Sequence, residues 1–203
     1  MDTNGYKILK GWNRTYINVD GIHTEPIFND NANAKTDKKR LQSTLRTGWA
    51  RQLRDRLATE FTHLSPSSLI LLESKPGCQR QAAHCDYIPT DELLSVEEGN
   101  IPLLFLLAIE PNTTIDLWPG SHHIIRGHNT NIPCIRHRIK LDIGDAIIFR
   151  ADLVHAGSSY EKTNRRIHAY LDSSMVHRDP NRTWIIYKHA SPLIRGLIDE
   201  TEY

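Results

Sequence analysis

The chain has 203 residues, of which 39% are hydrophobic and 24% are charged. This length suits one well-buried core and is short for two, so we expect a single domain over residues 1–203. The composition is that of an ordinary globular protein and excludes a collagen-like chain or a highly charged disordered one. The formal net charge of +1 also excludes a chain that is strongly basic or acidic overall.

Apolar segments that would indicate a membrane or secretory protein are missing from the sequence. The longest apolar run, Ile101–Ile109, is too short to cross a bilayer, and the first residues lack the apolar stretch of a secretory signal. We therefore expect an intracellular, cytoplasmic protein with no membrane partner, and leave a nuclear location open. The cysteines Cys78, Cys85 and Cys134 form no CxxC pair, so we expect reduced thiols.

Apolar residues recur at every fourth position between Asp37 and Phe61. They are Leu41, Leu45, Trp49, Leu53, Leu57 and Phe61. This spacing predicts an amphipathic helix over residues 37–61. The segment Lys35–Arg56 holds eight Lys and Arg against two Asp, a balance of +6, and we interpret it as a solvated helix face rather than a phosphate-binding one.

Beyond Ser65-Pro66-Ser67, short apolar runs separated by turn residues predict a series of strands. We place them at Ser68–Ser74, Ala82–Tyr87, Ile101–Glu110, Thr114–Trp118, His137–Leu141, Ala146–Arg150, Leu153–Ala156 and Arg166–Asp172. Without strand and helix alternation, this order favours a mainly β barrel or jelly roll supported by the N-terminal helix. Residues 173–203 form a C-terminal extension, in which Trp184–Tyr187 is expected to add an edge strand and a short helix.

The segment QRQAAHCDYIP contains the first candidate metal ligands. His84 and Asp86 are two residues apart, so in a strand their side chains project from the same face. An imidazole beside a carboxylate is the beginning of the 2-His-1-carboxylate triad of non-haem Fe(II), and His155 on a later apolar strand is the second histidine. A surface His-Asp pair is the alternative in a chain with 11 histidines, but the downstream residues favour the metal site.

The last predicted strand alternates two kinds of side chain. Ile167, Ala169 and Leu171 are apolar, whereas Arg166, His168 and Tyr170 are polar. If the apolar side lies beneath the helix, the polar side faces the pocket that holds the metal ligands. A buried guanidinium needs an anionic partner, and its planar fork matches a carboxylate, so we expect Arg166, rather than Arg165, to bind a dicarboxylate cosubstrate.

Read in order, these motifs resemble a known family. The sequence is similar to the phytanoyl-CoA dioxygenase-like branch of the Fe(II)- and 2-oxoglutarate-dependent oxygenases. The resemblance lies in the order of the motifs: QxxHxD, then Trp118–His122, Gly144-Asp145, His155-Ala156-Gly157 and a later arginine. The resemblance spans Ser68–Asp172 and implies a double-stranded β-helix, a cupin-like jelly roll. It also implies Fe(II), with 2-oxoglutarate and O2 as cosubstrates. Oxoglutarate would chelate the metal, its far carboxylate would meet Arg166, and succinate and CO2 would be released.

Further candidate contacts for the cosubstrate are His168, Tyr170 and Gln81, although Gln81 suits the start of a strand equally well. His122 is expected to shape a loop, with a place in the pocket left open. The acidic segment Tyr87–Asn100 is expected to overhang the pocket mouth.

The sequence thus predicts a dioxygenase that hydroxylates or otherwise oxidises a C–H bond of a small molecule or a protein side chain. A nucleic-acid demethylase of the same chemistry is the first alternative, supported only by the basic helix and the stretch His122–Lys140, and opposed by the acidic segment. A cupin that uses no oxoglutarate would leave Arg166 unexplained. A non-catalytic jelly-roll binding module that keeps the triad is the remaining alternative. Nothing in the sequence matches a coenzyme A site, and neither the substrate nor the oligomeric state is predicted.

Overall fold

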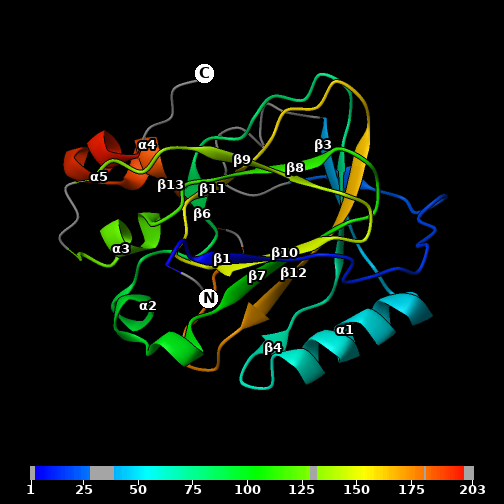
Figure 1. Ribbon diagram of the computed structural model, residues 1–203, viewed down its shortest axis with the longest axis horizontal. Coiled ribbons are helices and arrows are strands. Elements are labelled where there is room, and N and C mark those ends of the chain that lie inside the picture. The colour runs from blue at the N-terminus through cyan, green and yellow to red at the C-terminus, as the bar shows by residue number, and fades with distance from the viewer. Residues whose placement is uncertain (1–2, 28–38, 129–131, 181, 199–203) are drawn as a thin grey trace.

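The computed structural model describes residues 3–27, 39–128, 132–180 and 182–198. Within these ranges the chain forms two antiparallel sheets, with α1 on the outer side of the larger sheet and α3, α4 and α5 gathered at one end (Figure 1). The fold is therefore mainly β, and the predicted jelly roll is confirmed.

Among the described residues, the larger sheet has eight strands. In spatial order they are β1 (Tyr6–Leu9), β10 (Ala146–Arg150), β7 (Leu103–Ala108), β12 (Asn164–Asp172), β5 (Ile70–Ser74), β3 (Arg40–Thr44) and β2 (Glu25–Pro26), with β4 (Ser65–Pro66) also pairing with β12. The smaller sheet has the order β13 (Trp184–Ile185), β6 (His84–Cys85), β11 (His155–Gly157), β8 (Thr113–Leu117) and β9 (His137–Leu141).

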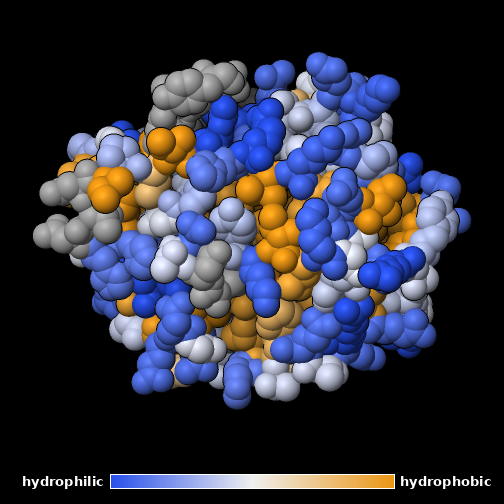
Figure 2. All heavy atoms as spheres, in the orientation of Figure 1, coloured by the Kyte–Doolittle hydropathy of each residue, from blue (hydrophilic) through white to orange (hydrophobic). Residues whose placement is uncertain are grey.

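Short helices join or cover the strands. They are α1 (Gly48–Glu60), α2 (Asp91–Ser95), the 3-10 turn η1 (Glu98–Asn100), α3 (Ser121–Ile125), α4 (Ile186–His189) and α5 (Pro192–Leu197). No helix in the described ranges is both long and apolar enough to cross a membrane. On the face shown in Figure 2, hydrophobic residues are exposed along the middle of the molecule, and hydrophilic residues surround them.

Two of the strand predictions agree with the structure at both ends. The predicted strands His137–Leu141 and Ala146–Arg150 coincide with β9 and β10, and the expected edge strand and short helix after residue 183 are β13 and α4. The prediction at Ala82–Tyr87 was too long, because only His84 and Cys85 pair with neighbouring strands.

The predicted helix over residues 37–61 was wrong in its first half. Residues 37 and 38 lie outside the described ranges, Arg40–Thr44 form strand β3, and the helix begins only at Gly48, after Thr47 caps it by accepting a hydrogen bond from the Ala50 N–H at 3.3 Å. A spacing of four places residues on one face of a helix but also on one face of a strand, so Leu41 and Leu45 fitted both periods.

Strand β12 separates the apolar cluster beneath α1 from the interior of the jelly roll. Ile167, Ala169 and Leu171 are fully buried in an apolar cluster that includes Leu53 and Leu57 of α1, as predicted. Burying a leucine side chain of this kind contributes roughly 1.5–3 kcal/mol, so the helix holds the strand firmly from outside. The intervening residues of β12 must then face the other sheet.

Candidate metal centre

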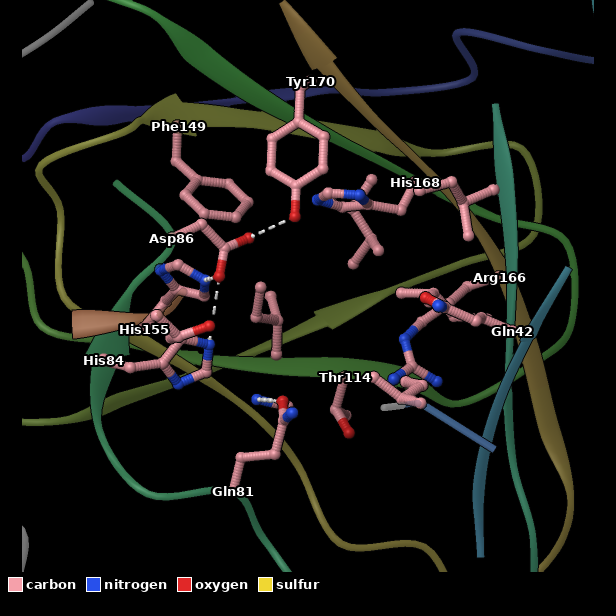
Figure 3. Close-up of a pocket in the computed structure, with 17 residues that line it drawn as sticks. Gln42, Gln81, His84, Asp86, Thr114, Phe149, His155, Arg166, His168 and Tyr170 are labelled. Atoms are coloured by element: carbon pink, nitrogen blue, oxygen red, sulfur yellow. Dashed lines mark hydrogen bonds and ion pairs between the residues drawn. The ribbon is translucent and has the colours of Figure 1, made fainter. Parts of the chain in front are cut away.

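His84 and His155 meet because their strands are neighbours. β6 and β11 pair in antiparallel register with His84 directly opposite His155, and the two ring centroids lie 4.4 Å apart. Asp86 follows β6 immediately, as the spacing of two residues required. One ligand atom from each of the three residues lies within 4.8 Å of the others, so the structure brings the predicted triad together (Figure 3).

Both imidazoles are held by their backbone-facing nitrogen. The Nδ1 of His84 lies 2.7 Å from the carbonyl of Ala82, and the Nδ1 of His155 lies 3.0 Å from the carbonyl of Leu153. Since a carbonyl oxygen only accepts hydrogen bonds, each Nδ1 must carry the proton. The lone pair of each Nε2 is thereby left free to bind a metal ion.

The Asp86 carboxylate stands between the two rings. Its Oδ1 lies 3.4 Å from the Nε2 of His84 and 3.6 Å from the Nε2 of His155. Burial alone would raise the pKa of Asp86, but the hydrogen bonds and charges of His155 and His84, when their Nε2 atoms carry protons in place of a metal ion, outweigh burial and hold the pKa well below its ordinary value. The carboxylate is therefore anionic at neutral pH, as a metal ligand must be.

The triad opens into a cavity of about 110 Å³ between the two sheets. Its described lining comes from both of them: Ile27, Gln42, Ile70, Leu72, Gln81, His84, Asp86, Leu106, Thr114, Ile115, Phe149, His155, Gly157, Arg166, His168, Tyr170 and Thr183. Figure 3 shows the triad on one side of this space and Arg166, Gln42 and Thr114 on the other. The metal ligands and the candidate carboxylate-binding residue thus face a shared interior.

Arg166 and Arg165 lie on opposite sides of β12. Arg166 is only 6% exposed, lines the cavity, and donates from Nη1 to the Ser74 hydroxyl at 3.0 Å. Among the residues that the structure describes, it has no carboxylate partner. Arg165 instead pairs with Asp20 at 3.1 Å and Glu110 at 3.0 Å outside the cavity.

The other candidate contacts also line the cavity, each in a different way. The pKa of His168 is lowered to about 4, chiefly by burial, so its ring is neutral at pH 7. The Gln81 amide oxygen accepts a hydrogen bond from the Gly157 N–H at 2.9 Å, which links it to the strand of His155. The Tyr170 hydroxyl contacts Asp86.

Two residues of β3 also belong to the site, although the spacing of the apolar residues predicted a helix there. Gln42 lines the cavity. Arg40, assigned to a solvated helix face, is only 3% exposed, and its Nη2 donates to the carbonyls of Gln79, Gly157 and Ser158 at 2.7–3.0 Å. Arg40 thereby ties the larger sheet to the end of the His155 strand. A strand prediction for Arg40–Thr44, with its alternating polar residues, would have found both.

The acidic segment Tyr87–Asn100 was expected to overhang the pocket mouth, but none of its residues lines the cavity. Leu93 is fully buried, and Arg126 donates to the carbonyls of Leu93 and Val96 at 2.7 and 3.1 Å. These contacts fold the segment back onto the protein, because its apolar residues belong to the core.

His122 lies on α3 and is not among the described residues that line the cavity. It is 3% exposed, and its Nδ1 is buried without a hydrogen-bond partner. Burial and the nearby charge of Arg150 lower its pKa from 6.5 to about 4. Between about pH 4 and pH 6.5, His122 is therefore neutral in the folded protein but protonated in the unfolded chain.

This difference predicts acid sensitivity. Since the unfolded state binds the extra proton, the free energy of unfolding should fall as the pH falls from 6.5 towards 4, with His122 contributing about 3 kcal/mol. Replacement of His122 by Asn should flatten the plot of unfolding free energy against pH, measured by chemical denaturation. Parallel plots for wild type and variant would refute this role.

No protein-family model and no curated protein matches the sequence. Solved structures do resemble the fold. The non-heme alpha-ketoglutarate-dependent carbocyclase SnoK from nogalamycin biosynthesis matches with a TM-score of 0.61 and 13% identity, over 88% of this chain and 83% of its own. HygX from Streptomyces hygroscopicus, crystallised with nickel, 2-oxoglutarate and hygromycin B, matches with a TM-score of 0.59 and 12% identity, over 85% and 84%.

A prolyl-4-hydroxylase from Pseudomonas putida matches with a TM-score of 0.54 and 10% identity, over 84% of this chain and 94% of its own. At such low identities the comparisons establish the fold. The chain thus has the jelly-roll fold of the Fe- and 2-oxoglutarate-dependent oxygenases.

Proposed function

We propose that the protein is an Fe(II)- and 2-oxoglutarate-dependent dioxygenase that oxidises a C–H bond of a small-molecule substrate. The observation that carries this proposal is the convergence of His84, Asp86 and His155 across a buried cavity from Arg166. Together the metal and oxoglutarate would supply the oxidising power: one O2 is consumed, oxoglutarate becomes succinate and CO2, and the substrate C–H bond becomes C–OH.

The donor set fits Fe(II). Two imidazole nitrogens and one carboxylate oxygen are the ligands of the facial triad, which leaves other coordination positions open for a chelating cosubstrate and for oxygen. The Nε2 atoms of His84 and His155 and the Oδ1 of Asp86 already face one another without a rearrangement of the backbone. We assign these three atoms to the metal.

The opposite side of the cavity fits the far carboxylate of oxoglutarate. Leaving a buried guanidinium without an anion is costly, and Arg166 has a hydroxyl partner in Ser74 but no carboxylate among the described residues. A bound carboxylate would complete its charge pairing with two parallel hydrogen bonds. A cupin that uses no oxoglutarate offers no such explanation for Arg166.

The remaining lining residues would keep the reaction dry. Leu72, Leu106, Ile115 and Phe149 bring apolar side chains into the cavity, and the Phe149 ring lies 4.9 Å from that of His155 in an edge contact. Excluding water from such a site strengthens its electrostatic interactions and protects reactive species from side reactions. We assign this role to the apolar residues around the triad.

A small-molecule substrate is favoured over nucleic acid. The described lining, histidines apart, carries charge only at Asp86 and Arg166, and neither is left over to bind phosphates. The exposed basic residues Arg51 and Arg54 belong to α1, which packs on the side of β12 away from the cavity. The fold neighbour crystallised with hygromycin B and the one from nogalamycin biosynthesis support the same preference.

Anaerobic titration tests the proposal directly. Fe(II) added to the metal-free protein together with 2-oxoglutarate should produce a weak visible absorption band, because a chelating 2-oxo acid accepts charge from the metal. Fe(II) alone should produce no such band, nor should Zn(II) with oxoglutarate, since the filled d shell of zinc has no redox chemistry. A binding module or an oxoglutarate-independent cupin predicts no band under any of these conditions, and that result would disprove the proposed function.

A further inference from the structure

The third metal ligand is oriented differently from the other two. Both histidines are fixed by carbonyl groups two residues earlier in the chain. The Asp86 carboxylate is instead held from across the cavity, because its Oδ2 accepts a hydrogen bond from the Tyr170 hydroxyl at 3.1 Å (Figure 3). Tyr170 belongs to β12 of the larger sheet, whereas Asp86 follows β6 of the smaller one.

Tyr170 is itself held on several sides. The Arg178 guanidinium lies 3.8 Å above the centre of its ring, and Arg178 also donates to Asp172 at 3.0 Å. The backbone N–H of Tyr170 donates to the Ser67 hydroxyl at 3.0 Å, and its carbonyl accepts from the Ser67 N–H at 2.8 Å. The ring of Tyr170 therefore has little conformational freedom, and its hydroxyl stays within reach of Asp86.

We propose that Tyr170 is a positioning residue that holds Asp86 with Oδ1 towards the metal and Oδ2 turned away from it. This inference rests on the proposed metal centre. With Oδ2 engaged by the phenol, the carboxylate presents one oxygen and leaves the adjacent coordination position for the cosubstrate. Tyr170 then acts through Asp86, and its single hydroxyl proton is not available for oxoglutarate, which revises its expected role as a cosubstrate contact.

The test is metal binding by Tyr170→Phe, with Co(II) as the probe and without oxoglutarate. Loss of the hydroxyl should weaken Co(II) affinity about 10- to 100-fold, the usual effect of removing a partner of a ligand. Because Oδ2 is then free to rotate towards the metal, the visible spectrum of bound Co(II) should also change. Both readouts are independent of turnover.

Tyr87→Phe is the matched control. Tyr87 is buried and its ring centroid lies 6.3 Å from that of the partly buried Tyr170, but its hydroxyl donates to Asp172 and not to a metal ligand. This variant should keep the wild-type Co(II) affinity and spectrum. Equal weakening in both variants would mean that any lost phenol loosens the fold, and would overturn the proposal.

Unchanged Co(II) affinity in Tyr170→Phe, with weaker oxoglutarate binding at saturating metal, would also overturn it, because Tyr170 would then be a cosubstrate contact. Failure of the proposed function has a separate signature. In that case the wild-type protein itself would not bind Co(II) at the triad, and His84→Ala would bind it as well as wild type does.

Discussion

Replacing His84, Asp86 or His155 by alanine should abolish Fe(II)-dependent conversion of 2-oxoglutarate to succinate while leaving the protein folded. Each residue offers one of the three ligand atoms that lie within 4.8 Å of one another. Removing even a hydrogen-bonding partner of a metal ligand typically lowers metal affinity or activity about 10- to 100-fold. Loss of a ligand itself should therefore reduce turnover by more than about a hundredfold. Succinate release measures the activity, and thermal unfolding checks the fold.

His122→Ala is the comparison for this set. His122 is a buried histidine that belongs to α3 and does not line the cavity, so this variant should still bind iron even if it is less stable. Near-wild-type turnover by any two of the three ligand variants would exclude the triad as the metal site. Loss of iron binding by His122→Ala in a folded protein would show that the assignment of ligands is incomplete.

The parts of this site that the sequence predicted are those governed by local periodicity. His84 and Asp86 share a face because they are two residues apart, and the alternation of β12 places Arg166 in the cavity and Ile167 beneath α1. Neither statement needs knowledge of which strands are neighbours. The direct opposition of His84 and His155 does need it, and only the pairing of β6 with β11 supplies it.

The parts that the sequence did not predict depend on contacts between distant segments. Arg40 binds carbonyl groups more than thirty positions away in the sequence. The nearby Leu41 and Leu45 are four residues apart, a spacing that suits a helix as well as a strand. The bond from Tyr170 to Asp86 likewise depends on how closely the two sheets approach. Side-chain type and spacing carry no information about that distance.

Arg166→Ala should raise the apparent dissociation constant for 2-oxoglutarate by more than a hundredfold, whereas Arg165→Ala should leave it unchanged. Removing one partner of a buried charge pair typically costs about 3–5 kcal/mol, and each 1.4 kcal/mol is about tenfold in affinity. Arg166 is buried in the cavity, while Arg165 is engaged with Asp20 and Glu110 on the other side of β12. Anaerobic titration of the Fe(II)-loaded variants with oxoglutarate measures both constants.

Conservative variants sharpen this comparison. Arg166→Lys keeps the positive charge but loses the planar fork, so its oxoglutarate affinity should still fall, although less than in Arg166→Ala. Arg165→Lys should be nearly silent, since Arg165 lies outside the cavity with its partners partly exposed, and ion pairs at the surface contribute only about 0–1 kcal/mol. If Arg165→Ala lost oxoglutarate binding and Arg166→Ala kept it, the register of β12 would be shifted by one residue. His168 and Tyr170 would then face away from the cavity, and the positioning role of Tyr170 would fail together with the cosubstrate site.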